Sequence, residues 1–455
     1  MAKGNRNEMM LNEPVSALIP KMAVPTIIAQ LITTVYNLVD TYFVSTLGTN
    51  ATAAVGVNAS LERVITMAAM LLGAGASSYI ARLLGAGKHE DADTVLSTSI
   101  FTALAFGVVF AVACKMMIMK IVYFLGATEE CVQYSIDYAN YVLYAAPFMI
   151  AQMVLNMTLR GEGSATYSMI GMGIGGILNC FLDPIFIYKL NLGVAGASMA
   201  TAISKTLSFC ILIAPYIRKK TNVRMETGFI RYRLEHIKEV VSIGSASFFR
   251  SFFGVFAAIM INRAAGSYST SALAGISVAT RVMMFPFGIV LGFGQGYQPV
   301  VGYNWGAQRY DRVKESYEFA VKVSVIGSLI MGGLLFVFSK QVITLFNSSA
   351  DGDVLRIGML AIRTEAACLI AHAFTSITNM FYAGIGHPVE AFFTAIARQG
   401  YCLWIMLAIL PKLFGIEGLA MCQGSADLLT LAIGIPLFFR AKAIIKARTD
   451  LQSAE

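Results

Sequence analysis

Long apolar segments separated by short polar ones run along this chain from Val15 onward. Several exceed the ~18 apolar residues that cross a bilayer, and Gly, Pro or Asn marks their ends. The pattern predicts twelve helices, at residues 15–47, 52–84, 91–124, 130–160, 165–188, 194–217, 235–265, 270–303, 312–346, 353–383, 388–412 and 417–445. The predicted fold class is therefore an all-α integral membrane protein with twelve transmembrane helices.

Composition agrees with this pattern. The chain has 455 residues, of which 57% are hydrophobic and only 13% charged, and its mean hydropathy is +0.67. A soluble protein would carry about twice that charge. The first fifteen residues are polar and no signal-peptide pattern follows, so we expect no removed leader. The seven Cys are scattered without a C-x-x-C pair, and we expect them to be small buried hydrophobes.

Lys and Arg gather in segments that share one side of the membrane if each helix crosses it. These segments are the N-terminus, residues 218–238, residues 309–314 and the end of the chain from residue 440. Basic loops mark the cytoplasmic side, so both termini are predicted to be cytoplasmic. The net charge of +8 is thereby explained by topology, and we expect no nucleic-acid partner.

The chain also repeats itself at offsets of 221–223 residues. The matching segments are LLGAGKHEDAD (83–93) with NWGAQRYDRVK (304–314), RGEGSATYS (160–168) with YAGIGHPVE (382–390), and LGVAGASMA (192–200) with FGIEGLAMC (414–422). The repeat predicts an N-lobe at 1–220 and a C-lobe at 221–455, joined by a basic cytoplasmic linker at about 218–238. Six helices per half predict a pseudo-two-fold axis along the membrane normal, with a cavity between the lobes.

Polar residues interrupt the fifth helix. Asn179 and Asp183 are four residues apart and therefore share one helix face. Pro184 has no N–H, so the carbonyl of Cys180 loses its intrahelical donor. A carboxylate inside a membrane span is costly, which makes Asp183 a candidate functional residue.

Three other helices bring polar groups to a similar depth. At ~1.5 Å per residue, Asp40, Tyr138 and Thr201 lie roughly 8–12 Å below the outer surface, as Asp183 does. Two facing carboxylates cannot both stay ionised cheaply, so one binds a proton or a cation lies between them. Such oxygen ligands suit Na⁺ or H⁺ and not zinc or copper. The alternative is that each residue only makes a hydrogen bond between helices.

The second half lacks this set of acids. The repeat offset places Ala258 where Asp40 stands, and Cys402 and Met406 where Asn179 and Asp183 stand. A predicted acidic site would therefore belong to the N-lobe alone.

Six segments together resemble the MATE family of multidrug and toxic compound extrusion transporters, in its MepA-like branch. They are PVSALIPKMAVPTIIAQLITTVYNLVDTYFVSTLG, ARLLGAGK, LRGEGS, NCFLDPIFI, GVAGASMATAIS and GYNWGAQR. The resemblance implies a V-shaped bundle of two six-helix lobes in the cell membrane. It implies a secondary active antiporter, acting as a monomer without a cofactor, that exports organic cations and amphiphilic drugs in exchange for inward H⁺ or Na⁺.

The resemblance also implies particular site residues. The cation-binding positions of the family match Asp40, Tyr138, Asn179, Asp183, Ala197 and Thr201, of which Asp40, Asn179, Asp183 and Thr201 would hold Na⁺. Pro25 matches a hinge in the first helix. Met153 and Met157, with Asn156 and Asn37, are candidates for the substrate cavity, because methionines form an adaptable apolar wall.

Two other functions compete with this one. A flippase of lipid-linked glycan precursors would favour a cationic cavity, for which Arg250, Arg281 and Arg398 are available. An enzyme is not expected, because no H-E-x-x-H or G-x-S-x-G motif occurs. Glu62 and Arg63 are interpreted as part of a structural or gating ion pair and His372 as a buried histidine with its hydrogen bonds satisfied.

Overall fold

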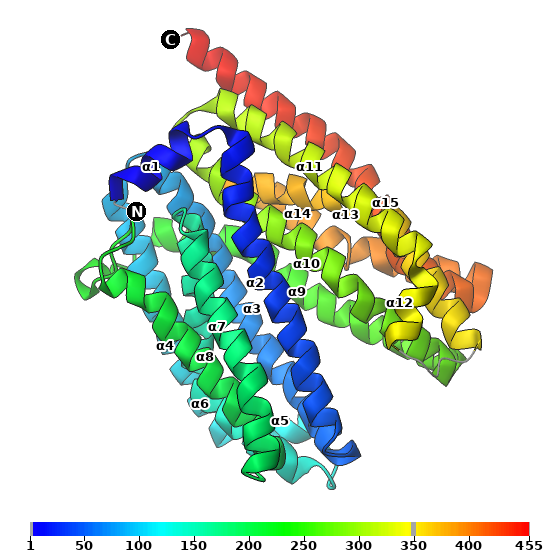
Figure 1. The fold of residues 1–455 in the computed structure, drawn as a ribbon. Coiled ribbons are helices and arrows are strands. Elements are labelled where there is room, and N and C mark those ends of the chain that lie inside the picture. The colour runs from blue at the N-terminus through cyan, green and yellow to red at the C-terminus, as the bar shows by residue number, and fades with distance from the viewer. Residues whose placement is uncertain (1–2, 347–351, 455) are drawn as a thin grey trace. The chain divides into compact units, whose positions relative to one another are not determined.

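The computed structural model describes residues 3–346 and 352–454, and within these ranges the regular structure is helical, without a strand (Figure 1). Ten stretches of the described chain are long and apolar enough to cross a membrane. One of them, Pro388–Ser453, forms two spans that are divided at Gly415, and the long helix α13 (Gly352–Ile385) adds another. Counted in this way, the described helices give the twelve spans that the sequence predicts.

Contacts divide the chain into two compact units. Unit 1 comprises Met1–Asn12 and Val24–Gly244, and unit 2 comprises Glu13–Ala23 and Ser245–Glu455. Two helices therefore contribute to both units, α2 (Val15–Ser45) and α9 (Leu234–Tyr268).

In unit 1, helix α6 (Val132–Gly161) lies at the centre. It packs against several other helices. These neighbours are α3 (Thr49–Gly85), α4 (His89–Met116), α5 (Ile118–Phe124), α7 (Ala165–Pro184) and α8 (Gly193–Ile217). The short helix α1 (Lys3–Asn12), which the polar N-terminal sequence did not lead us to expect, contacts α3.

In unit 2, helix α13 has the corresponding central place. Its neighbours are α10 (Thr270–Gly306), α11 (Tyr310–Val337), α12 (Ser339–Phe346), α14 (Pro388–Ala397) and α15 (Tyr401–Ala454). Both α6 and α13 are the fourth spanning helix of their half, so the internal repeat of the sequence reappears in how each half is packed.

Several expected helices are interrupted. The predicted span 388–412 is broken between α14 and α15 by the turn Arg398–Gly400. Gly415 has φ 59° and ψ −134°, so its conformation is not helical and divides α15 into two spans. A left-handed φ is easily adopted by glycine, which explains why the chain turns at this residue.

Glycines allow close contact between helices of unit 1. A Cβ atom at Gly75 would lie 1.9 Å from the carbonyl oxygen of Val240, and one at Gly244 would lie 1.8 Å from that of Leu71. The backbones of α3 and the first part of α9 are therefore in direct contact, which only residues without a side chain permit.

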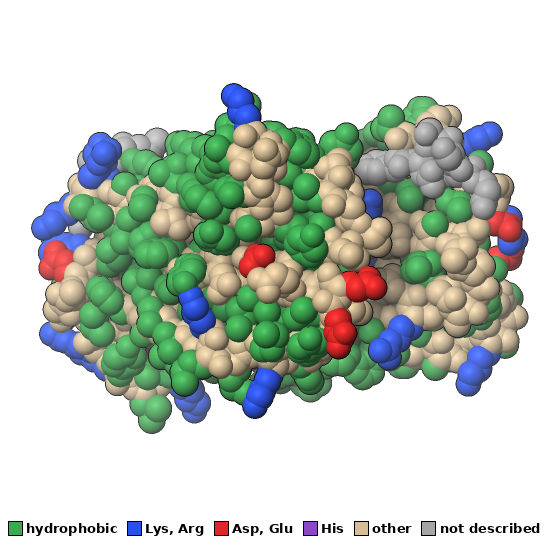
Figure 2. Space-filling model, turned by 90° about the horizontal axis from the view of Figure 1, so that it is seen from below, with side chains coloured by type: hydrophobic (Ala, Val, Ile, Leu, Met, Phe, Trp, Pro, Cys, Tyr) green, Lys and Arg blue, Asp and Glu red, His purple; other side chains and the backbone are tan. Residues whose placement is uncertain are grey.

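The surface of the spanning helices is apolar. Large side chains such as Val109, Phe181 and Leu329 are exposed on helices of both units. Figure 2 shows hydrophobic side chains over much of the face that it draws, with Lys and Arg mainly at its edges. Exposed apolar surface of this extent fits a protein surrounded by lipid.

Candidate functional site

The polar residues predicted in α7 and α8 do lie together. The side-chain nitrogen of Asn179 donates to Asp183 Oδ1 at 3.2 Å and to Thr201 Oγ1 at 3.4 Å. All three residues are buried. The helices approach closely because glycines of α7 face α8, as at Gly175 beside Ser208. Local spacing and close packing thus place an amide, a carboxylate and a hydroxyl at one point of unit 1.

Three oxygens of this region lack donors. Asp40 Oδ1, Asn179 Oδ1 and Asp183 Oδ2 are buried and accept no hydrogen bond from any described residue. The charge of Asp40 also acts electrostatically on Asp183. A buried acceptor without a donor is costly, and carboxylates are costlier still. The chemistry of these oxygens fits a bound proton or a hard cation such as Na⁺.

The helix changes its geometry directly after Asp183. Residues Ile185–Lys189 form a π-helical turn that follows Pro184. Proline has no N–H for the regular ladder of hydrogen bonds, so the register after it is disturbed. Single π-helical turns are frequent at functional sites.

Tyr138 contacts Glu62, an acid of α3. Its hydroxyl donates to Glu62 Oε1 at 2.9 Å. We interpreted Glu62 as part of an ion pair, and the structure adds this hydrogen bond from Tyr138 to the electrostatic influence of Lys205 and Arg63 on its carboxylate. The hydroxyl of Tyr138 thus links α6 to α3, and the charges of Asp40 and Asp183 act on it electrostatically.

Lys205 is the residue that sequence reasoning missed. Its ammonium donates to the hydroxyl of Tyr36 at 2.5 Å and interacts electrostatically with Asp40 and Glu62. Lys205 follows Thr201 by four residues and therefore shares its face of α8. That spacing was available in the sequence and would have placed a cation beside the acids.

The remaining predicted residues are dispersed through unit 1. Ala197 is fully buried in α8, one turn before Thr201, and Pro25 lies inside α2, next to the residue at which that helix passes into unit 1. Asn37 is exposed and Met153 is partly buried.

Two of the substrate-cavity candidates lie within the packing between helices. Asn156 accepts a hydrogen bond from the hydroxyl of Ser168, and Met157 packs against Gly73 of α3. The structure therefore does not gather Asn37, Met153, Asn156 and Met157 around one point as it gathers Asn179, Asp183 and Thr201.

The sequence model of the MatE family matches this chain twice, at residues 25–185 and 246–410. The chain belongs to the MatE family. The two matches begin 221 residues apart, which confirms the internal repeat and its spacing. Its long apolar helices and its family make this chain a multi-pass membrane protein.

Curated relatives resemble this MatE protein over most of their length. The "Multidrug export protein MepA" of Staphylococcus saprophyticus is 27% identical over 400 residues, which cover 87% of each chain. The protein of the same name from Staphylococcus aureus is 25% identical over 406 residues, covering 89% of each chain.

Solved structures also match over nearly the whole chain. One described as the outward-facing conformation of a multidrug resistance MATE family transporter has a TM-score of 0.91 at 27% identity, covering 97% of this chain and 98% of its own. A transporter from Pyrococcus furiosus matches with a TM-score of 0.90 at 27% identity, covering 98% of each chain. That transporter is described as having a binding pocket of reverse polarity, which suggests a different function for it.

Proposed function

We propose that this protein is a secondary active antiporter that exports organic cations and amphiphilic drugs in exchange for inward H⁺ or Na⁺. Its family and the multidrug export proteins among its relatives support export of small molecules. The observation that carries the proposal is the set of three buried oxygens without donors, on Asp40, Asn179 and Asp183. A proton or cation that binds there supplies the partner that these oxygens lack.

The coupling follows from the charges of unit 1. An ion that neutralises the acids favours one conformation of the transporter, and export requires that substrate favours the other. Lys205 is a second cation beside the same acids and competes with the incoming ion for Asp40 and Glu62. When the ion is released on the cytoplasmic side, the ammonium of Lys205 compensates part of the negative charge of Asp40 and Glu62.

The proposal includes orientation and partners. Both termini are cytoplasmic, since the basic segments of the sequence lie on that side. The transporter acts as a monomer on small molecules and needs no cofactor besides the coupling ion. The alternative, a flippase of lipid-linked glycan precursors, is less well supported because the named relatives export drugs.

Accumulation of a fluorescent organic cation in cells without other exporters tests the proposal. The comparison is between the wild type, Asp183→Asn and Asp137→Asn. Asp137 is a matched control, because it is an acid of α6 whose hydrogen bond comes from Gln133 at 2.9 Å, outside the set of three oxygens. We expect Asp183→Asn cells to accumulate the dye like cells without the transporter and Asp137→Asn cells to exclude it. Full exclusion by Asp183→Asn at equal expression would refute the assignment of the site.

A further inference from the structure

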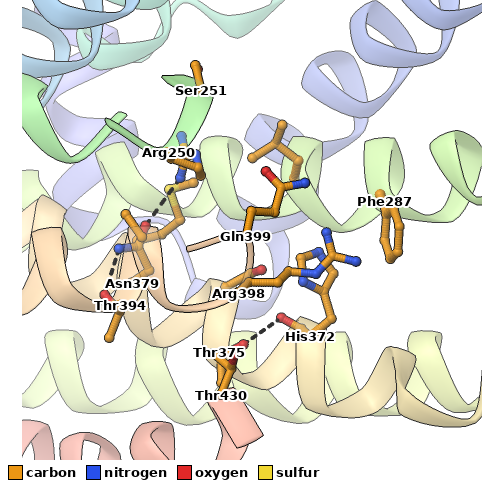
Figure 3. Close-up of a pocket in the computed structure, with 14 residues that line it drawn as sticks. Arg250, Ser251, Phe287, His372, Thr375, Asn379, Thr394, Arg398, Gln399 and Thr430 are labelled. Carbon is orange, nitrogen blue, oxygen red and sulfur yellow. Dashed lines mark hydrogen bonds between the residues drawn. The ribbon is translucent and has the colours of Figure 1, made fainter. Parts of the chain in front are cut away.

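Unit 2 contains a cavity of about 260 Å³ in the part of the fold shown in Figure 3. Side chains from α9, α10, α13, α14, α15 and the break before α15 line it, among them Arg250, Phe287, Asn379 and Gln399. A second cavity of about 380 Å³ shares Phe287, Arg398 and Gln399 with it. Together they have the size and the mixture of apolar and polar lining that small-molecule sites usually have.

Arg250 places a positive charge in this cavity. It lies near the midpoint of α9, and its guanidinium donates to Asn379 Oδ1 at 3.4 Å and to Ser247 Oγ at 3.2 Å. Both partners are neutral, and the described residues place no carboxylate within ion-pair distance of this guanidinium. A charge inside a membrane span without a countercharge is a functional-site candidate.

Arg398 differs from Arg250 in that its charge is compensated. Its Nε and Nη2 atoms donate to the two oxygens of Asp427 at 2.6 and 3.3 Å, and its guanidinium lies 4.1 Å from the ring centre of Phe287. His372 approaches the same carboxylate at 3.9 Å. Figure 3 shows Arg398, His372 and Phe287 to one side of Arg250 and Asn379. Asp427 is thus engaged by Arg398 and is not available to Arg250.

Two arginines, Arg281 and Arg398, and one acid, Glu365, line the adjoining cavity, and Arg398 pairs with Asp427. Arg250 lines only the cavity of 260 Å³. The three arginines thus outnumber the two carboxylates, Glu365 and Asp427, by one, and Arg250 lies in the cavity that no described carboxylate lines.

The backbone is irregular at the same place. α14 ends at Ala397 and α15 begins at Tyr401, and Arg398 and Gln399 of the intervening turn line the cavity. Irregular backbone at membrane depth occurs where it is enclosed by protein or lines a cavity, and transporters build binding sites at such breaks. The N-terminal end of α15 adds a partial positive charge on the side of this turn.

We propose that this cavity of unit 2 binds the anionic group of an amphiphile, a carboxylate or a phosphate on an apolar body. Arg250 pairs with the anion and Gln399 donates its amide, while Phe287, Leu291 and Met380 contact the apolar body. The site is built from residues of unit 2 alone, and it would extend the ligands of the protein to anions. It goes beyond the proposed cation export and does not depend on it.

Calorimetric titration of the full chain in phosphatidylcholine nanodiscs tests this site. The probes are 2-naphthoate and 2-naphthyl phosphate, with 2-naphthamide as the uncharged analogue. We expect both anions to bind at least tenfold more tightly than the amide, and Arg250→Gln to weaken anion binding at least tenfold. Arg263→Gln is the matched control, because it removes the same charge from an exposed position of the same helix.

A second variant tests the site in case Arg250→Gln does not fold. Ser247→Asp places a carboxylate beside Arg250, where the Ser247 hydroxyl now accepts its hydrogen bond. We expect it to keep the thermal unfolding midpoint and to lose anion binding. Undetectable naphthoate binding to the wild type, equal affinity for the amide, or full affinity in either variant would overturn the proposal.

A change of lipid distinguishes the two possible sources of the anion, a lipid phosphate and a soluble amphiphile. The titration is repeated in nanodiscs containing phosphatidylglycerol, at high salt so that surface charge is screened. Weaker naphthoate binding there identifies a lipid phosphate as the occupant, and unchanged binding identifies a soluble amphiphile. Asp183→Asn is expected to bind naphthoate as the wild type does, so that failure of cation export and failure of this site give different results.

Discussion

Glu162, in the turn between α6 and α7, is a fully buried carboxyl outside the spanning segments. One of its oxygens accepts a hydrogen bond from the backbone N–H of Val223 at 3.2 Å, while the other has no donor among the described residues. Burial outweighs these contacts and the nearby charge of Arg6, and raises the pKa of Glu162 from 4.5 to about 7. The carboxyl of Glu162 therefore gains or loses its proton near neutral pH.

The raised pKa predicts a pH-dependent stability. Between pH 4.5 and 7 the folded protein binds a proton at Glu162 that the unfolded chain has lost, so stability falls as pH rises through this window. At ~1.4 kcal/mol per unit the penalty above pH 7 is about 3 kcal/mol. We expect Glu162→Gln to unfold at a higher temperature than the wild type at pH 8 and at a similar temperature at pH 4.5. The exposed Glu129→Gln is the control, and equal midpoints of Glu162→Gln and wild type at pH 8 would contradict the account.

Residue spacing predicted part of the candidate site. Asn179 and Asp183 could be paired from their separation of four, and the structure joins them to Thr201. The bond from Tyr138 to Glu62 could not be predicted, because it depends on how α6 and α3 are rotated against each other. The position of the Lys205 ammonium likewise depends on the approach of α2 to α8.

Helix α3 provides a test of packing between elements, because its glycines differ in surroundings. A Cβ atom added at Gly56 would have no neighbouring atom within 4 Å, while one at Gly75 would meet the Val240 carbonyl at 1.9 Å. Alanine favours a helix by about 0.5–1 kcal/mol over glycine. We expect Gly56→Ala to raise the thermal unfolding midpoint and Gly75→Ala to lower it, because displacing a backbone costs about 1–3 kcal/mol. A midpoint for Gly75→Ala at or above that of Gly56→Ala would show that α3 and α9 are not in direct contact.

The helices themselves were largely predictable and their interruptions were not. Apolar length alone located the spans, since a bilayer demands it. The turn at Arg398–Gly400 contains two polar residues and a glycine, but Arg, Gln and Gly also occur inside continuous helices of this chain, so their presence alone did not show a break. Helix α1 was missed because its first residues are polar, although Arg6 and Met10 are buried.

For the whole molecule, the distribution of basic residues predicts the orientation in the membrane. Alkaline phosphatase fused after Ser269, which follows α9, is expected to be active, because the predicted topology places this residue outside. The same enzyme fused after Arg309, which follows α10, is expected to be inactive, and a fluorescent protein fused there to fluoresce. An inactive fusion after Ser269 and an active one after Arg309 would contradict the predicted topology and with it the proposed direction of transport.

The repeat was also visible in the sequence, because both halves keep the same short motifs at one offset, and the two family matches confirm it. The sequence shows only part of the chemical difference between the two halves. The acids of unit 1 could be read from the sequence, whereas the uncompensated charge of Arg250 depends on Asp427 being held by Arg398 in the folded unit.

The central claim is that an ion bound among Asp40, Asn179 and Asp183 drives export. Efflux of a fluorescent organic cation from proteoliposomes, under an imposed pH gradient or an imposed Na⁺ gradient, tests it most directly. The account predicts that one of the two gradients drives efflux through the wild type and that Asp183→Asn, folded and inserted equally well, shows none. Gradient-driven efflux through Asp183→Asn at the rate of the wild type would contradict it.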